Sequence, residues 1–249
     1  MKRKNVITIV NIILVAVFLF SAFNVVKINL DYNKANNIYG KMQDTYVAFN
    51  KKVPTPEQTK EPELPITVDF DSLLNRNNDV VGWLYCPDTV VNYPVVKGEN
   101  NDQYLRRDID GKYLISGTLF ADYRNDSLNQ SANYIIYGHN MKNGTMFSMI
   151  TKYKQQAHYD QYPTMYYLTP DANYKLELFA GLVVKRDDKV YFPNQSKDAF
   201  FQLANEYRTK STFKSDVELN YNDTIITLST CSYEFDNARY IVFAKLTRI

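Results

Sequence analysis

The chain has 249 residues, of which 45% are hydrophobic and 14% aromatic, enough for a packed core and against a wholly disordered chain. Its formal net charge of +2 comes from acidic and basic residues spread along the sequence, so no basic stripe indicates a nucleic-acid partner. Only two cysteines (Cys86, Cys231) and two histidines (His139, His158) occur, too few for a four-ligand structural zinc site. We therefore expect no metal, and nucleophilic chemistry for any thiol and imidazole.

The N-terminal segment predicts a membrane anchor. Basic residues at 2–4 precede an apolar run over residues 6–26, which is long enough to cross a bilayer, since about 20 residues suffice. The run is apolar on all faces, unlike an amphipathic core helix. A cleaved signal peptide would have a shorter apolar region and a better cleavage pattern than residues 21–23 offer, so an uncleaved anchor is favoured. The preceding positive charge predicts a cytoplasmic N-terminus and an extracellular remainder, in a single-pass protein of the cell membrane.

Two polar segments follow the apolar run. Residues 31–49 predict a polar helix, which we interpret as a stalk. Residues 51–65 contain four prolines among Lys, Glu, Thr and Gln, a composition that favours an extended spacer. The sequence thus predicts three parts: a cytoplasmic tip with a membrane anchor (1–30), a helical stalk with a Pro-rich linker (31–65), and a folded domain (66–249).

The folded domain is predicted to be mainly β with accessory helices. Helical periodicity occurs at 69–76, at 145–153 and most clearly at 197–210, where Phe200, Leu203, Ala204 and Tyr207 share one face. Eight short strands suggest a closed or rolled sheet. The predicted strands are 80–85, 90–96, 117–120, 134–137, 165–168, 174–184, 224–229 and 239–246.

Three polar residues lie at the ends of these strands. The β-branched, alternating segment 224–229 delivers Thr230 and Cys231 at its end, a rigid place for a nucleophile. Arg239 opens the next strand and would lie close to Cys231 if the two strands pair as a hairpin. His139 follows the strand 134–137, and Gly138 is expected to give the turn the freedom to direct the ring.

These residue types suit acyl transfer through a thioester. A deprotonated thiol is a strong nucleophile, and an imidazole can accept its proton and later protonate a leaving amine. Arginine does not lose its proton in proteins, so it cannot be the base. Its planar fork instead suits a substrate carbonyl or the oxyanion that develops during attack.

The motifs resemble those of the sortase family. Residues 227–231 (Thr-Leu-Ser-Thr-Cys) are similar to the sortase signature Thr-Leu-x-Thr-Cys, and the order His, Cys, Arg fits, whereas papain-like proteases have Cys before His. The helix at 197–210 and three further motifs resemble class B sortases in particular. These motifs are 92–96 (Asn-Tyr-Pro-Val-Val), 120–125 (Phe-Ala-Asp-Tyr-Arg-Asn) and 137–141 (Tyr-Gly-His-Asn-Met). The resemblance covers residue 69 to the C-terminus.

This resemblance implies an eight-stranded β-barrel or roll. Cys231 would be the nucleophile, His139 the general acid/base and Arg239 the stabilising cation, with no metal or organic cofactor. The substrate would be a surface protein with a C-terminal sorting signal, cleaved after its threonine. The acyl group would pass to an amine of a peptidoglycan precursor or cross-bridge, which attaches the protein to a Gram-positive cell wall.

Two alternatives concern the catalytic residues. Cys231 could form a disulfide with Cys86, although this would leave the His and Arg motifs unexplained, and we interpret Cys86 as a small buried filler. Asp236 is an alternative to Arg239 as the third member, since it could orient the imidazole as a carboxylate does in Ser-His-Asp sites.

Other residues have less specific signals. Ser229 and Thr230 are candidate substrate-binding residues, and for Ser229 a packing role is equally open. His158 has no accompanying motif and is expected at the surface. Two other functions are open: a membrane-anchored cysteine protease, in which no added amine captures the acyl group, and a non-catalytic surface adhesin, which leaves the Cys/His/Arg set unexplained.

Overall fold

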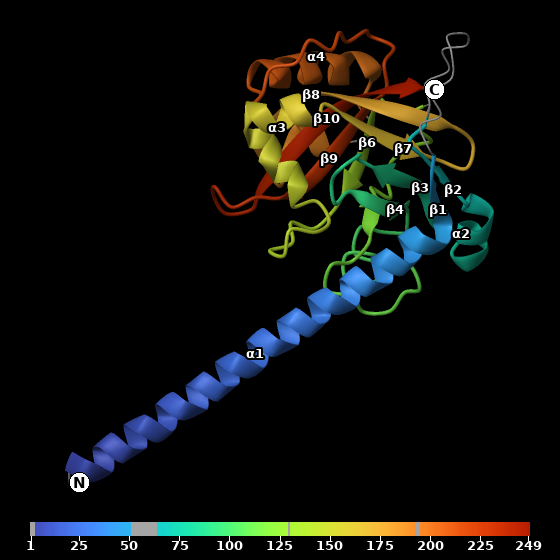
Figure 1. Ribbon diagram of the computed structural model, residues 1–249. Coiled ribbons are helices and arrows are strands. Elements are labelled where there is room, and N and C mark those ends of the chain that lie inside the picture. Colours follow the sequence, from blue (N-terminus) through green and yellow to red (C-terminus); the bar gives the residue numbers. More distant parts are fainter. Residues whose placement is uncertain (1–2, 51–63, 129, 193–194) are drawn as a thin grey trace.

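The computed structural model describes residues 3–50, 64–128, 130–192 and 195–249. Eight strands form a closed β-barrel in the order β10-β8-β7-β3-β4-β5-β6-β9, which confirms the predicted eight-stranded barrel (Figure 1). Neighbouring strands are antiparallel except for two parallel pairs, β4 with β5 and β6 with β9. The barrel strands are β3 (Val80–Tyr85), β4 (Asn92–Val96), β5 (Leu119–Ala121), β6 (Asn133–Tyr137), β7 (Thr164–Leu168), β8 (Asn173–Lys185), β9 (Ile225–Cys231) and β10 (Ala238–Arg248).

Strand β9 separates two hydrophobic cores. Successive side chains of a strand point to opposite faces. Ile226 and Leu228 accordingly pack in the larger core, which fills the barrel, and Ile225 packs in a second core under α4 (Lys197–Thr209). The alternation places Ser229 and Cys231 on the same face as Ile225. The four helix residues that the spacing singled out, Phe200, Leu203, Ala204 and Tyr207, are all buried in this second core.

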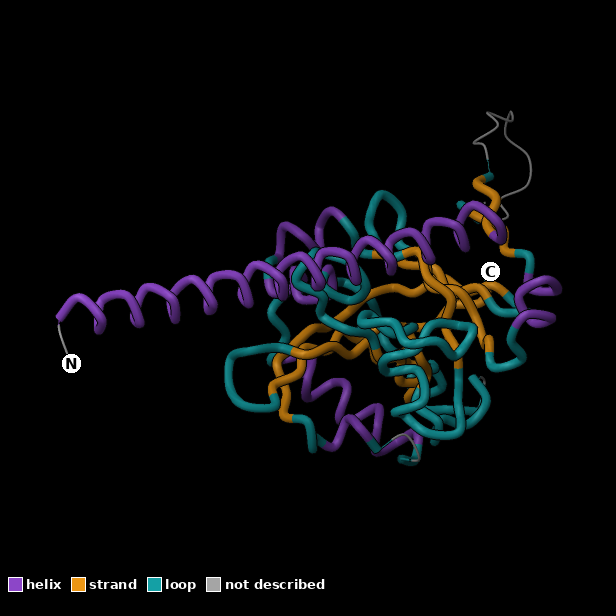
Figure 2. The backbone as a smooth tube through the Cα atoms, turned by 90° about the horizontal axis from the view of Figure 1, so that it is seen from below, coloured by secondary structure: helices purple, strands orange, loops and turns teal. Residues whose placement is uncertain are grey.

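Helix α1 (Arg3–Tyr46) runs without a break from the apolar N-terminal segment to the barrel. It is long and apolar enough to cross a membrane, and its N-terminal part projects away from the barrel (Figures 1 and 2). The predicted stalk differs from the structure, because the helix ends at Tyr46 and Ala35, Tyr39 and Met42 are buried against the barrel. The division at residues 30 and 65 stays a prediction.

A short antiparallel sheet joins the end of α1 to the barrel. Its strands, β1 (Val47–Phe49) and β2 (Ile66–Val68), were not predicted. Most of the predicted Pro-rich spacer, residues 51–63, lies outside the described residues.

The remaining helices are short. Helix α2 (Phe70–Arg76) agrees with the prediction, and Asp69 caps it by accepting a hydrogen bond from the Ser72 amide. The helix predicted over 145–153 is wrong in extent, because a 3₁₀ turn, η1 (Met149–Lys154), and a separate α3 (Gln156–Gln161) form instead. A second 3₁₀ turn, η2 (Lys189–Tyr191), lies between β8 and α4.

Candidate active site

Cys231 and Arg239 lie directly opposite each other in the antiparallel pair of β9 and β10. Residues opposite each other in such a pair have side chains on the same face of the sheet. The hairpin predicted from the sequence is therefore confirmed, and it brings the thiol and the guanidinium to one side of the barrel. Cys231 is the last residue of β9 itself, where the prediction placed it just beyond the strand.

Three hydrogen bonds hold the loop that carries His139 against the end of β9. The Gly138 amide donates to the Ser229 carbonyl at 3.1 Å, and the Thr230 hydroxyl donates to the Gly138 carbonyl at 2.8 Å. The Asn140 side-chain amide donates to the Cys231 carbonyl at 2.9 Å. Because β6 and β9 are parallel neighbours with Tyr137 opposite Ser229, His139 emerges at the same barrel end as Cys231.

The imidazole of His139 contacts a backbone carbonyl. Its Nε2 lies 2.7 Å from the carbonyl oxygen of Leu105, in the connection between β4 and β5. Burial lowers the pKa of His139 below its ordinary value of 6.5; the Leu105 contact opposes this shift and the charge of Arg106 adds to it. The ring is therefore mainly neutral at pH 7, the form that can accept a proton.

Gly138 is required for space and not for backbone freedom. Its φ lies outside the left-handed region, which among the described glycines only Gly111, Gly117 and Gly144 occupy. A Cβ at position 138 would lie 2.5 Å from Leu119 and 2.6 Å from the Phe147 ring. The sequence-based reason for this glycine is thus wrong: close packing under the His139 loop excludes a side chain.

A cleft of about 480 Å³ contains all three predicted catalytic residues. Its lining also includes both candidate substrate-binding residues. Its members are Asn101, Asp102, Leu105, Phe120, Arg124, Tyr137, Gly138, His139, Arg186, Tyr191, Ser229, Thr230, Cys231 and Arg239. The arrangement places a thiol, an imidazole and a guanidinium around one space, as acyl transfer requires.

Arg239 is the better placed of the two candidates for third member. Within the described part of the chain, no carboxylate lies within ion-pair distance of its guanidinium, which donates to the Ala238 carbonyl at 2.9 Å. The fork thus retains donors for an incoming anion. Asp236 is exposed in the loop between β9 and β10 and does not line the cleft.

The hydroxyls of Ser229 and Thr230 are engaged within the protein. Ser229 is buried and shares a 2.8 Å hydrogen bond with the Tyr191 hydroxyl, and buried Thr230 donates to the Gly138 carbonyl. Both residues line the cleft. Their contacts explain why hydroxyl-bearing residues occur there, and a substrate-binding role stays a prediction.

The two cysteines are free, so the disulfide alternative is not formed. Cys86 is completely buried, as predicted for a small filler, and its Sγ lies 3.7 Å from the Thr164 carbonyl. Burial raises the pKa of Cys86 to about 11. Cys231 is partly exposed and is the thiol that a substrate can reach.

His158 is not the surface residue that the sequence suggested. Its ring is partly buried between those of Tyr153 and Tyr162, with centroid distances of 4.7 and 5.0 Å. It does not line the cleft that contains Cys231. The two histidines therefore differ in role: His139 belongs to the candidate site and His158 to an aromatic cluster.

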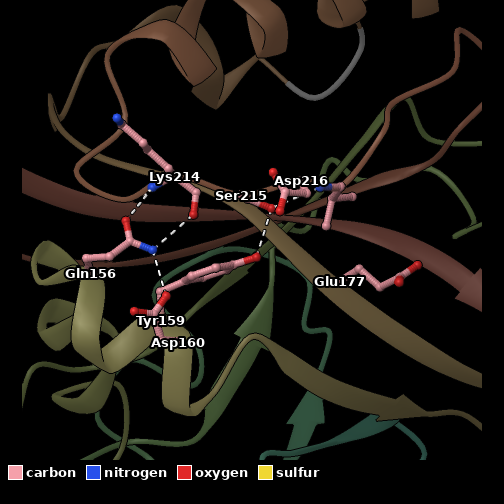
Figure 3. A pocket seen from close by; sticks show the side chains of 8 residues that line it. Gln156, Tyr159, Asp160, Glu177, Lys214, Ser215 and Asp216 are labelled. Atoms are coloured by element: carbon pink, nitrogen blue, oxygen red, sulfur yellow. Dashed lines mark hydrogen bonds between the residues drawn. The ribbon is translucent and has the colours of Figure 1, made fainter.

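A second cleft, of about 460 Å³, lies between α3, β8 and residues 214–217 (Figure 3). Its polar groups bond mainly to one another. Gln156 donates to the Lys214 carbonyl and accepts from the Lys214 amide, and the Tyr159 hydroxyl donates to that of Ser215. The lining contains neither cysteine nor histidine, so this cleft has no thiol and no imidazole base for acyl transfer.

Sequence reasoning missed several residues that line the cleft around Cys231. Leu105, Arg186 and Tyr191 have no motif of their own, and each is distant in sequence from Cys231. The motif at 120–125 did point to this region, because Phe120 and Arg124 both line the cleft.

Comparison with known proteins finds sortases, the family that the sequence motifs resemble. The sequence model of the sortase domain matches residues 84–247. Sortase B of Staphylococcus aureus is 29% identical over 252 residues, which covers 100% of both chains. Sortase B of Listeria monocytogenes is 31% identical over 240 residues and 94% of both chains.

Solved structures agree with this assignment. Bacillus anthracis sortase B in complex with AAEK1 is 31% identical, with a TM-score of 0.73 over 88% of this chain and 99% of that chain. The Staphylococcus aureus sortase B–substrate complex is 32% identical, with a TM-score of 0.68 over 72% of this chain and 85% of that chain. The chain therefore belongs to the sortase family, and the relatives and structures that it resembles here are class B sortases.

Proposed function

We propose that this protein cleaves the C-terminal sorting signal of surface proteins after a threonine and transfers the acyl group to a peptidoglycan amine. Sortases are transpeptidases of cell-wall sorting, so acyl transfer is the reaction of the family. The observation that carries the specific roles is the shared cleft of Cys231, His139 and Arg239. The register of β9 and β10 holds Cys231 opposite Arg239. Hydrogen bonds to the end of β9 hold the loop that carries His139.

In the first half-reaction Cys231 forms a thioester. Its sulfur attacks the carbonyl carbon of the substrate threonine, and His139 takes the thiol proton. The oxygen of the tetrahedral intermediate becomes negative, and Arg239 donates hydrogen bonds to it. Collapse breaks the carbon–nitrogen bond, and His139 returns its proton to the leaving amine.

In the second half-reaction an amine releases the acyl group. The amine nitrogen attacks the thioester carbon, His139 accepts the proton of the attacking amine, and Arg239 again stabilises the oxyanion. Collapse expels the sulfur, which regains a proton from His139. One solved sortase B is complexed with triglycine, and a glycine peptide presents such an amine.

The proposed location follows from α1, which is a candidate membrane anchor. With basic residues 2–4 on the cytoplasmic side, the barrel lies outside, where sorting signals and cell-wall amines meet. Protease added to intact protoplasts should digest the barrel. Digestion only after lysis would contradict this orientation.

The test uses the full-length chain in detergent with quenched fluorogenic peptides that share one threonine and vary around it. We expect cleavage after threonine by the wild type and none by Cys231→Ala. Cys86→Ala is the matched control and should keep its activity, because Cys86 lies outside the cleft. Cleavage that survives Cys231→Ala would refute the mechanism.

Added triglycine separates the remaining alternatives. A transpeptidase gives the acyl–triglycine product by mass spectrometry, since the amine competes with water for the thioester. A cysteine protease gives only the free acid. An adhesin cleaves no peptide of the panel.

A further inference from the structure

Behind the wall of the active-site cleft lies a buried carboxylate, that of Asp122. It follows β5 and is fully buried. Arg124 donates to it twice, from Nε to Oδ1 at 2.9 Å and from a terminal nitrogen to Oδ2 at 2.7 Å. The Tyr137 hydroxyl donates to Oδ2 at 2.8 Å, and the Asn101 side-chain amide donates to the same oxygen at 3.1 Å. One carboxylate thus binds three side chains from three segments of the chain.

All three of these donors line the cleft with Cys231, while Asp122 does not. We infer that Asp122 is a positioning residue for the sorting signal: it fixes Asn101, Arg124 and Tyr137 as one rigid wall of the substrate cleft. This inference rests on the function proposed above. It assigns a role in substrate selection to a residue that cannot touch the substrate itself.

The wall extends beyond these three side chains. Arg124 also donates to the Tyr191 carbonyl at 3.0 Å, and the Tyr191 ring stacks on that of Tyr137 with centroids 6.1 Å apart. The Tyr137 ring also packs against Phe120, at 5.3 Å. Aromatic faces of this kind suit the extended backbone and apolar side chains of a peptide. The hydrogen bonds of Asp122 therefore connect the parts of this wall, which come from β5, β6, η2 and the segment around Asn101.

The charge of Asp122 keeps Arg124 within the wall. Burial raises the pKa of Asp122, but hydrogen bonds from Arg124 and Tyr137 outweigh it, and the pKa lies below its ordinary value of 3.8. The carboxylate is thus ionised at neutral pH and neutralises the guanidinium. Without this charge, Arg124 would lose its fork-to-fork partner and turn toward the solvent-filled cleft.

A second Asp–Arg pair provides a matched control away from the cleft. Asp110 accepts from Arg76 in the same two-point geometry, at 2.7 and 2.8 Å. This pair joins α2 to the connection between β4 and β5, and neither residue lines the cleft. Asp122→Asn and Asp110→Asn each remove one charge from a bidentate pair, although the Asp110 side chain is 31% exposed and that of Asp122 is fully buried.

The first experiment measures cleavage by the full-length chain in detergent, with the fluorogenic peptide that the wild type cleaves best. We expect Asp122→Asn to raise KM about 10- to 100-fold with kcat within about threefold, since charged hydrogen bonds of this strength hold the wall. The differences in kcat/KM among the peptides of the panel should be smaller for Asp122→Asn than for the wild type. Asp110→Asn should leave KM, kcat and discrimination unchanged. An unchanged KM for Asp122→Asn would overturn the inference while wild-type cleavage still supports the proposed function.

The second experiment needs no peptide cleavage. Cys231 is alkylated with iodoacetate and with iodoacetamide, and buried Cys86 does not compete. The unpaired Arg124 of Asp122→Asn should raise the iodoacetate-to-iodoacetamide rate ratio at least about twofold, because a freed cation attracts the anionic reagent. The double change Asp122→Asn with Arg124→Gln should restore the wild-type ratio. An unchanged ratio in Asp122→Asn would contradict the wall model even if no peptide is cleaved.

A milder variant covers the case in which Asp122→Asn does not fold. Tyr137→Phe keeps the ring in the wall and removes one hydrogen bond to Asp122 without unpairing a charge. KM should rise at least about threefold but less than in Asp122→Asn, because the carboxylate loses one hydrogen bond and keeps those from Arg124 and Asn101. A KM equal to that of the wild type would argue against the wall.

Discussion

Arg239 stands opposite Cys231 across the β9–β10 hairpin, and in the described part of the chain its guanidinium has no carboxylate partner. An arginine in a stable ion pair would have its fork occupied before the substrate arrives. Here the side chain donates a hydrogen bond to the adjacent Ala238 carbonyl. The guanidinium is thus held near the thiol while most of its donors remain available for an oxyanion.

Arg239→Lys should lower kcat about 10²- to 10³-fold with little change in KM. Lysine keeps the charge but loses the planar fork, and removing one oxyanion donor typically has this effect. The measurement is steady-state cleavage of the fluorogenic peptide. Arg248→Lys, at the exposed end of β10, is the matched control and should behave as wild type.

The rival assignment to Asp236 is tested in the same assay. Asp236→Asn should keep kcat within about twofold, because the side chain is exposed and lies outside the cleft lining. A loss of kcat as large as that of Arg239→Lys would instead indicate that Asp236 is the third member of the site.

The imidazole of His139 should titrate below pH 6.5. Burial favours the neutral ring, the Leu105 carbonyl favours the protonated ring, and the Arg106 charge disfavours it, with a net lowering of the pKa. As the pH falls through this pKa, the ring gains a proton and can no longer serve as a base. The acid limb of kcat/KM should therefore lie below pH 6.5.

NMR of protein with ¹³C-labelled histidine measures this pKa directly. Only two histidine signals exist, and His158→Gln identifies that of His139. Arg106→Gln should raise the midpoint, since it removes a neighbouring positive charge. A wild-type midpoint above 6.5 would instead indicate an imidazolium stabilised by the Cys231 thiolate.

Gly138→Ala should damage both stability and catalysis. The added Cβ meets Leu119 and the Phe147 ring at 2.5–2.6 Å, so the His139 loop must move. Overpacking of this kind costs about 1–3 kcal/mol, and a displacement of 1 Å at a catalytic group can lower the rate about 10²-fold. Thermal unfolding and peptide cleavage check the two effects.

Gly40→Ala is the control for this substitution. Gly40 lies in α1, and a Cβ there meets nothing within 4 Å. Alanine in a helix interior is about 0.5–1 kcal/mol more favourable than glycine. Equal losses of activity in both variants would show that the space under His139 does not control the ring.

The sequence predicted features that depend on neighbours along the chain. Alternating residues of β9 and the short loop after it were enough to place Cys231 beside Arg239. The contact of His139 with Leu105 joins residues 34 positions apart, and that of Ser229 with Tyr191 spans 38. No local pattern encodes such pairs, because they depend on how the barrel closes.

One missed contact did have a local signal. Ala35, Tyr39 and Met42 recur at helical spacing, i, i+4 and i+7, which indicates an apolar stripe against a partner surface. The surrounding polar residues suggested a stalk, and the apolar stripe is the reason that this part of the helix packs against the barrel.

Docking of α1 also connects the candidate membrane anchor to His139. The Tyr39 hydroxyl donates to the Gly117 carbonyl, and Gly117 sits so close to Leu105 that a Cβ there would clash with the Leu105 carbonyl oxygen. That same oxygen contacts His139. The C-terminal end of α1 therefore packs against the Gly117–Leu105 backbone, whose carbonyl oxygen at Leu105 contacts the His139 ring.

Met42→Ala should consequently lower the free energy of unfolding by about 2–4 kcal/mol, because it leaves a cavity beneath a buried methionine. Lys41→Ala, on the exposed side of the same turn, should change it by less than about 0.5 kcal/mol. Urea unfolding followed by tryptophan fluorescence measures both, since Trp83 is buried in the same core.

N-terminal truncation distinguishes the packing of α1 against the barrel from its role as a candidate membrane anchor. A chain that begins at residue 31 keeps Tyr39 and Met42, whereas one that begins at residue 66 loses both together with β1. The longer chain should retain full-length stability and kcat in solution. The shorter chain should unfold at lower urea concentration and cleave peptide more slowly, because the Gly117–Leu105 backbone loses its support. Equal activity of the two would mean that α1 acts only as an anchor, and that the barrel alone positions His139.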